Sequence, residues 1–408
     1  MSVRYVWTVS TPSRLSIPET VLAIARTLEE AGYETWCVGG AIRDTLLALA
    51  NSDFDLATSA RPEDVQRLFR RTVPIGVEHG TVAVLDRDNR PHEVTTFRRD
   101  VVTDGRHAVV EFGVSVDEDL ARRDFTINAI AYHPFRHEWR DPFGGREDLD
   151  RRIVRAVGDP AQRFREDYLR ILRALRFAAR FGFSIDAATW EAALASAPGL
   201  AHLSAERVRD EWFGGLATAR SPGELARLWQ DVGGLSRWLP EVGAGSGPEG
   251  FDVLNRMPRD PVLLTSHVST DPAATLRRLK CSRAEMERGR RLAEHRGTWP
   301  DPAKAVAVRR WMAGAGPAVD DLVALAGAQG HPAGLEAAVA AVRASGAPLG
   351  IGDLAIRGED LLAAGVPPGP AVGQTLRRLL DSVLEQPELN TRDALLRLAV
   401  APAAGPET

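Results

Sequence analysis

Residues 36–59 read WCVGGAIRDTLLALANSDFDLATS, in which an apolar, strand-like run stops at Gly39 and Gly40 and a helix-like segment follows. Two glycines between a strand and a helix let a phosphate approach backbone N–H groups at the positive end of the helix dipole. Arg43 stands one turn inside the same helix. The stretch predicts a phosphate-binding turn at Gly39 and Gly40 with Arg43 beside it, although a glycine pair is also common in plain turns.

Two aspartates, Asp53 and Asp55, stand one residue apart at the end of this stretch. In a strand, residues i and i+2 face the same way, so the two carboxylates project side by side. A cation relieves their repulsion, and Mg²⁺ is held by one or two carboxylates together with substrate phosphates. We therefore predict catalytic metal ligands at Asp53 and Asp55, and a bound nucleotide. Glu93, in the strand-like segment 92–97, is the candidate third catalytic carboxylate. The alternative is a surface or capping pair.

Composition describes an ordinary protein with adequate cores: 408 residues, 44% hydrophobic and 26% charged, with a net charge of −4. We find no run long enough to span a membrane and no apolar stretch typical of a signal peptide. Cys37 and Cys281 lie far apart without a partner motif, which argues against a disulfide framework or a zinc site. These features predict a cytoplasmic location.

Helix and strand signals alternate over roughly the first 145 residues, and helical signals dominate from about residue 150 onward. We therefore expect an α+β protein with a small mixed sheet followed by an all-helical array. Ser16, Pro18, Glu19 and Gly32 mark the two ends of an expected first helix. The expected strands are 33–38, 80–85 and 92–97. Long helices are expected at 161–180, 187–196, 204–217, 222–230, 284–294, 304–314, 317–328 and 333–344, with several more in 351–400.

The segment 117–132, DEDLARRDFTINAIAY, places Arg122 and Asp124 ahead of an amphipathic run. Asn128 follows Asp124 by four residues, which puts the two on one face if the run is a helix. Arginines here, Arg123 included, are candidates for holding phosphates, and Asp124 with Asn128 for holding ribose hydroxyls. A helix cap with a surface salt bridge is the equally weighted alternative.

The segment 163–183 predicts a helix with one packed face and a polar edge that carries Glu166, Asp167 and Arg170. Cytosine and adenine each present an amine donor beside a ring acceptor, whereas uracil and guanine present a carbonyl beside an N–H. An accepting Asp167 and a donating Arg170 therefore suit C and A, with Glu166 placed to orient Arg170. A simple Glu–Arg helix pair is the alternative.

Residues 151–180 hold nine arginines, Arg173 and Arg176 among them, against three acidic residues. Such a basic stripe in a mildly acidic protein predicts a surface for a polyanion, and a solvated helix face remains the alternative. We include Arg173 and Arg176 among the candidate nucleotide-binding residues.

Eight motifs together resemble the class II tRNA nucleotidyltransferase and poly(A) polymerase family of the polymerase-β-like superfamily. They are VGGAIRD, DFDLAT, PIGVEHGTV, EVTTFRR, DLARRDFTINAIAY, DPFGG, REDYLRILRALRF and LSAERVRDE, and they cover residues 36 to about 212. The resemblance implies metals on Asp53 and Asp55, a ribose contact from Asp124, and base selection by Asp167 and Arg170. It also implies addition of CMP and AMP from CTP and ATP to a tRNA 3′ end.

The resemblance implies four domains: a catalytic head (1–145), a base-selecting neck (146–215), a body (216–345) and a tRNA-binding tail (346–408). GVEHGTVAV and the segment 354–396 resemble the CCA-adding branch, which includes bacterial enzymes, more than the poly(A) polymerase branch. Nothing in the sequence indicates an obligate protein partner.

In the family, the segment corresponding to 99–112 forms a flexible loop linked to the switch from C to A. The sequence DGRH within it favours retained A addition. The segment is slightly short, and Ala108 stands where proline is expected, which leaves open an enzyme that adds only A or only CC, besides a poly(A) polymerase. From other classes, an Asp-x-Asp glycosyltransferase and an RNA-binding protein without activity are the rivals.

Overall fold

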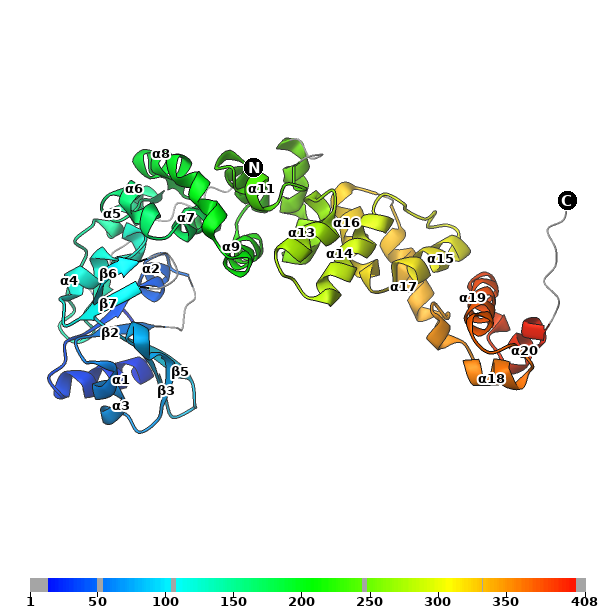
Figure 1. The fold of residues 1–408 in the computed structure, drawn as a ribbon, viewed down its shortest axis with the longest axis horizontal. Coiled ribbons are helices and arrows are strands. Elements are labelled where there is room, and N and C mark those ends of the chain that lie inside the picture. Colours follow the sequence, from blue (N-terminus) through cyan, green and yellow to red (C-terminus); the bar gives the residue numbers. More distant parts are fainter. Residues whose placement is uncertain (1–13, 50–53, 104–107, 244–247, 332, 401–408) are drawn as a thin grey trace. The chain divides into compact units, whose positions relative to one another are not determined.

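The computed structural model describes residues 14–49, 54–103, 108–243, 248–331 and 333–400. The chain divides into two compact units, residues 1–240 and 241–408 (Figure 1). The first unit contains the sheet and the helices that surround it, and the second unit is built of helices. This agrees with the predicted α+β class, while the four-domain division remains a prediction.

A mixed seven-stranded sheet forms the centre of the first unit, in the order β3-β4-β5-β2-β1-β8-β9. Strands β2 and β5 run parallel, and the other neighbours are antiparallel. The expected strands at 33–38, 80–85 and 92–97 are confirmed as β1, β4 and β5. The bounds are β1 Thr35–Val38, β2 Asp55–Thr58, β3 Thr72–Gly76, β4 Thr81–Leu85, β5 Pro91–Thr96, β8 Ala131–Tyr132 and β9 Trp139–Arg140.

The two faces of this sheet have different surroundings because strand residues alternate between them. Leu56, Val82 and Val94 point into the larger core, to which helices α1, α2 and α3 also contribute. Figure 1 shows α1 and α3 next to one another beside the strands. The opposite face carries Val38 and Asp55. The helices of this region are α1 Glu19–Glu30, α2 Gly40–Leu46, α3 Pro62–Leu68, η1 Val77–His79, α4 Val116–Ala121, η2 Thr126–Asn128 and α5 Gly145–Arg151.

The predicted N-cap of the first helix, Ser16, is wrong by two residues. Helix α1 begins at Glu19 with Pro18 as its N-cap residue, and no side chain caps it, so Ser16 and Glu19 do not form a capping box. Proline fixes its own φ, here −56°, and that constraint begins the helix. Gly32 follows the end of the helix with φ +87°, as expected.

Two expected helices differ in the structure. The segment 117–132 holds α4, the short 3₁₀ turn η2 and strand β8 instead of a continuous helix. The expected helix 161–180 is two helices, α6 Pro160–Glu166 and α7 Leu169–Phe181. Asp167 is extended between them, with φ −157°, and its carboxylate accepts a hydrogen bond from the Leu169 N–H. Such a local side-chain bond competes with helical hydrogen bonding and starts a new helix.

The segment 99–112 is a β-hairpin in its described part. Strand β6 (Arg98–Thr103) pairs antiparallel with β7 (Ala108–Phe112). Val and Thr make up half of β6, and β7 contains two valines and a phenylalanine, residues that favour extended structure. Residues 104–107, the DGRH sequence, lie outside the described residues.

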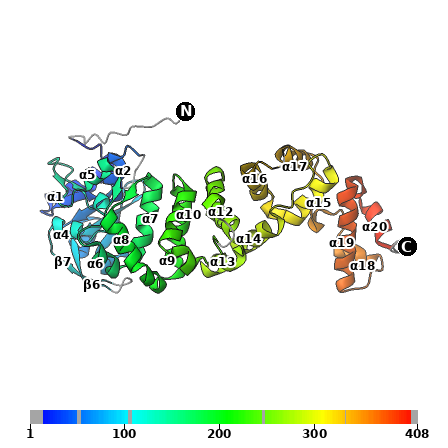
Figure 2. The ribbon, with the colours of Figure 1, turned by 90° about the horizontal axis from the view of Figure 1, so that it is seen from above.

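The remaining helices of the first unit follow α7, and two of them, α9 and α10, pack against it. Helices α7, α9 and α10 lie side by side (Figure 2), and Trp212 on α9 meets Trp229 on α10 with ring centroids 4.9 Å apart. The bounds are β10 Ile153–Val154, β11 Ser184–Ile185, α8 Ala187–Ser196, η3 Ala197–His202, α9 Ala205–Thr218, α10 Pro222–Asp231 and α11 Gly234–Trp238.

The second unit consists of helices among its described residues. At its C-terminal end, α18, α19 and α20 (Figure 2) enclose a core that includes Leu361, Leu379 and Leu395. No helix in the described ranges has the length and apolar character needed to cross a membrane. The bounds are η4 Pro248–Arg256, α12 Pro261–Val268, α13 Pro272–Arg278, α14 Arg283–His295, α15 Ala305–Ala315, η5 Gly316–Ala318, α16 Val319–Gln329, α17 Leu335–Ala344, η6 Ile351–Asp353, α18 Gly358–Ala363, α19 Pro370–Glu385, η7 Pro387–Leu389 and α20 Arg392–Val400.

Gly145, the first residue of α5, lets that helix pack directly on η2. An added Cβ would lie 2.0 Å from the carbonyl oxygen of Thr126. Gly145→Ala should lower the free energy of unfolding by about 1–3 kcal/mol because the two elements must separate. Gly214→Ala within α9 is the control: its Cβ would come no closer than 3.8 Å to another group, and alanine favours a helix. Equal stability of the two variants in chemical denaturation would contradict this packing.

Candidate active site

A cavity of about 580 Å³ opens where the sheet, the α4–η2 region and helix α7 meet. Eight arginines and four carboxylates are among the described residues that line it, so the lining is strongly basic. The lining consists of Val38, Gly39, Gly40, Arg43, Asp55, Thr81, Glu93, Thr95, Arg98, Arg122, Arg123, Asp124, Asn128, Asp167, Arg170, Arg173, Arg176, Phe177 and Arg180.

Most predicted site residues therefore come together in one cavity. Glu166 does not line it but contacts Arg170, which does. Asp53 lies outside the described residues.

Gly39 and Gly40 leave no room for a larger side chain beside the charged groups around them. Gly39 is the N-cap residue of α2 and has φ +76°, a region that favours glycine. An added Cβ would lie 3.1 Å from Arg123 Nη1 and 3.8 Å from Asp55 Oδ2. At Gly40 it would lie 3.3 Å from Arg43 Nη2. Both glycines thus leave room for charged groups at the start of α2.

The carboxylates of Asp55 and Glu93 lie next to one another because of strand register. Leu56 of β2 pairs with Val94 of β5 in parallel, so the preceding residues, Asp55 and Glu93, are neighbours on the opposite face. Both line the cavity, and their oxygens are the donors that hard divalent cations prefer. Within the described ranges, no three His, Cys, Asp or Glu side chains are grouped to hold a metal.

Arg43 is more deeply buried than its predicted role suggests. Its Nε donates to Asp44 Oδ1 at 2.8 Å, its Nη1 donates to Asn128 Oδ1 at 2.5 Å, and its guanidinium lies 5.1 Å from the ring centre of Phe177. Burial lowers the pKa of Arg43, although the Asp44 carboxylate opposes that shift. Arg43 thus forms the buried floor of the cavity and joins α2 to η2.

Asp124 and Asn128 meet as expected, although the segment between them is a 3₁₀ turn and not an α-helix. Asp124 Oδ1 accepts from Asn128 Nδ2 at 2.9 Å and from the Phe125 N–H at 2.8 Å. Asp124 Oδ2 accepts from Arg173 Nε at 2.8 Å. Burial alone would raise the pKa of Asp124, but the Arg173 charge and these hydrogen bonds outweigh it and lower the pKa. The carboxylate is therefore ionised at neutral pH.

Asp119 is a residue that the sequence analysis missed. It is fully buried, and its carboxylate pairs with Arg122 at 2.9 Å and Arg123 at 3.1 Å. Burial would raise the pKa of Asp119, but the charges of both arginines outweigh it and lower the pKa. The spacing of three and four residues between Asp119 and these arginines is the sequence signal that could have revealed it.

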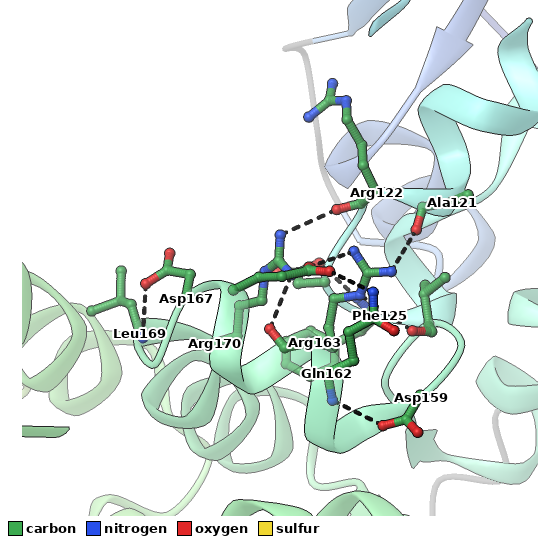
Figure 3. A network of polar contacts seen from close by, with 12 residues as sticks. Ala121, Arg122, Phe125, Asp159, Gln162, Arg163, Asp167, Leu169 and Arg170 are labelled. Carbon is green, nitrogen blue, oxygen red and sulfur yellow. Dashed lines mark hydrogen bonds and ion pairs between the residues drawn. The ribbon is translucent and has the colours of Figure 1, made fainter. Parts of the chain in front are cut away.

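Glu166 holds Arg170, as predicted, with Arg170 Nη1 donating to Glu166 Oε2 at 2.7 Å. Figure 3 shows that the Arg170 side chain also reaches the backbone: Nη1 donates to the Arg163 carbonyl oxygen at 3.1 Å, and Nη2 to that of Arg122 at 3.2 Å. Arg170 therefore connects α7 to the α4–η2 region at a fixed position.

Asp167 contacts helix α9 and the start of α7. Besides the Leu169 N–H, its carboxylate accepts from Arg207 Nη2 on α9 at 2.6 Å. Glu211, also on α9, contacts Arg176 at 2.6 Å and Arg173 at 3.7 Å. The sequence analysis did not single out Arg207 or Glu211, although both lie in the motif LSAERVRDE. Other missed lining residues are Thr81, Thr95, Arg98, Phe177 and Arg180.

Two family models match the chain. Residues 35–155 match the poly A polymerase head domain, and residues 182–241 match a probable RNA and SrmB-binding site of polymerase A. The first match contains the glycine turn and the sheet carboxylates. The fold and the site thus define a nucleotidyltransferase, a class whose fold implies a divalent metal.

Similarity extends over nearly the whole chain. The CCA-adding enzyme of Limosilactobacillus fermentum is 35% identical over 401 residues, which cover 93% of this chain and 96% of that relative. The solved structure of the Bacillus stearothermophilus CCA-adding enzyme in complex with CTP is similar with a TM-score of 0.78 and 30% identity, covering 93% and 96%. The chain belongs to the family of CCA-adding enzymes.

Other relatives match over a shorter part. The CCA-adding enzyme of Geobacillus stearothermophilus is 44% identical over 231 residues, and the match spans about half of each chain, 54%.

The lowered pKa of Asp124 predicts a pH-dependent contribution to stability. An ionised Asp124 stabilises the fold above the ordinary pKa of 3.8, and this contribution is lost as the pH falls through the lower folded-state pKa. Asp124→Asn should reduce the free energy of unfolding by roughly 1–3 kcal/mol near neutral pH. The difference from the parent should shrink in chemical denaturation at about pH 3. A difference that stays constant down to that pH would contradict the ion pair.

Proposed function

We propose that the protein adds CMP and AMP from CTP and ATP to the 3′ end of tRNA, releases pyrophosphate and thereby completes the CCA end. The observation that carries this proposal is that the sheet carboxylates Asp55 and Glu93 line the same cavity as Asp167 and Arg170. Similarity to CCA-adding enzymes over nearly the whole chain supports it. The two cysteines without a partner motif and the proposed tRNA substrate both favour a cytoplasmic location.

The basic lining suits a nucleoside triphosphate. Arginine forks donate two parallel hydrogen bonds to phosphate oxygens. Arg122 and Arg123 are pre-positioned by Asp119, so little side-chain entropy is lost when they bind a phosphate. Asp124 with Asn128 would hold the ribose, and Arg173, itself bound to Asp124, would transmit this contact to α7.

Asp53 and Asp55 would hold the divalent metal, which we propose to be Mg²⁺, and Glu93 is the candidate third carboxylate. When bound, it would supply positive charge that activates the attacking hydroxyl and stabilises the leaving pyrophosphate. The donor set fits because carboxylate oxygens at Asp55 and Glu93 lie together at the cavity wall. Gly39 keeps the space beside the Asp55 carboxylate clear. The protein itself needs to provide position and electrostatic stabilisation for phosphoryl transfer.

Base selection would fall to Asp167 and Arg170. Arg170 is held by Glu166 and two carbonyl oxygens, so its remaining donor directions are fixed. Asp167 shares its carboxylate with Arg207, which would hold the accepting oxygens in place. An acceptor and a donor in fixed positions admit the edges of cytosine and adenine and leave the carbonyl edges of uracil and guanine unpaired.

An enzyme that adds only A or only CC, or a poly(A) polymerase, is the alternative. A glycosyltransferase gives no role to Asp167 and Arg170, and an RNA-binding protein without activity gives none to the paired carboxylates.

The test is a gel assay with Mg²⁺ and tRNA ending at the discriminator base, at C or at CC, each with CTP, ATP or both. The shortest tRNA should gain three nucleotides when both are present. Asp55→Ala should lose all addition while still binding tRNA, whereas the control Asp210→Ala, at an exposed position on α9, should keep both activities. Arrest after two nucleotides, extension of only the CC end, or a long A ladder would each overturn complete CCA addition.

Removal of the Asp167 carboxylate should relax base choice. Asp167→Ala should raise UTP incorporation relative to CTP by about 10-fold or more, because an unpaired carbonyl edge is no longer penalised. Single-turnover rates with each nucleotide measure this ratio. Asp210→Ala, at an exposed position on α9, is the matched control. A variant that discriminates CTP from UTP like the parent would contradict the assignment.

A further inference from the structure

A row of side chains crosses the sheet through the candidate metal carboxylates. Val73 pairs with Ala83, Ala83 pairs with Glu93, and Asp55 pairs with Val38. Register also makes Glu93 and Asp55 neighbours. Directly paired residues point to the same face of a sheet, so the row runs Val73, Ala83, Glu93, Asp55, Val38 on one face.

Two cavities share the middle of this row. Val38, Asp55 and Glu93 line the arginine-rich cavity. Asp55 and Glu93 also line a second cavity of about 970 Å³, whose wall continues to Val73 and Ile75 on β3. The carboxylates thus lie between a basic cavity on one side and a more apolar one on the other.

Val73 and Ile75 are unusually exposed for large apolar side chains, at 41% and 50%. They lie on the edge strand of the sheet, where Pro74 lacks an N–H and an irregular register between Pro74 and Gly76 interrupts pairing. These features make the edge a poor template for another strand. Two exposed apolar side chains that line a cavity together with the candidate metal carboxylates instead indicate a binding surface.

We propose that Val73 and Ile75 bind the last nucleotide of the acceptor RNA, and that its 3′-hydroxyl meets Asp55 and Glu93 from the side opposite the arginine-rich cavity. This inference rests on the proposed function. Phosphoryl transfer places the attacking and leaving oxygens roughly in line, so the acceptor must approach from the side away from the triphosphate. The second cavity, lined by Val73 and Ile75, provides this approach to the carboxylates.

The chemistry of the surface suits a terminal nucleotide whose identity changes during the reaction. Aliphatic side chains contact ribose and base faces without reading hydrogen-bonding edges, so they accept any of the successive ends. The lining of this cavity also includes Asp86 and Asp88 against Arg90, a net negative set that disfavours phosphate binding there. The contacts are therefore to the ribose and base of the terminal nucleotide.

The first test uses the full-length double variant Val73→Ser/Ile75→Ser with tRNA ending in CC and ATP. We expect the KM for tRNA to rise about 10-fold, since two apolar contacts are lost, and the KM for ATP to stay within about 2-fold. Leu194→Ser, on α8 and 42% exposed, is the matched control and should change neither value. An unchanged KM for tRNA in the double variant, with the parent active, would overturn this inference alone.

The second test does not depend on turnover. A tRNA with a photoreactive 4-thio nucleotide at its 3′ end should cross-link to a peptide that contains residues 72–76. Cross-links confined to other peptides would overturn the assignment. Failure of the parent protein to extend any tRNA would instead overturn the proposed function, and this inference with it.

Discussion

The ion pair between the buried Asp124 and the partly buried Arg173 fixes the geometry on which the rest of the site depends. Asp124 follows the α4 region and Arg173 lies on α7, so this contact joins the sheet-bearing part of the first unit to its helices. Burial raises the cost of the Asp124 charge, and the Arg173 guanidinium offsets that cost. The pKa of Asp124 is lowered and the pKa of Arg173 is raised. At Arg173, burial would lower the pKa, but the carboxylates of Asp124 and Glu211 outweigh that effect.

Around this pair, acidic residues hold arginines in place and leave part of each guanidinium toward the cavity. Asp119 does so for Arg122 and Arg123, and Glu211 does so for Arg176. A cluster of arginines without such partners would repel itself and lose the fixed positions that phosphate binding needs. The arrangement therefore combines a net positive lining with rigid side chains, which suits a triphosphate better than mobile surface charges would.

Sequence reasoning predicted the local parts of this site well. The glycine turn is encoded within a few residues, and the strand containing Glu93 was recognised from its own β-branched residues. The break at Asp167 was missed because apolar periodicity continues across it, while the decisive hydrogen bond to the Leu169 N–H is a side-chain contact. The partnership of Arg207 with Asp167 spans 40 residues and depends on how α7 and α9 pack, which no local pattern reveals.

The central claim is that one cavity binds either CTP or ATP and that protein side chains, without a nucleic-acid template, read the base. Equilibrium titration of the parent protein with each of the four ribonucleoside triphosphates, in Mg²⁺ and without RNA, tests it most directly. The account predicts one binding site for which CTP and ATP compete, with UTP and GTP weaker by about 10-fold or more. Equal affinity for all four nucleotides, or independent sites for CTP and ATP, would contradict it.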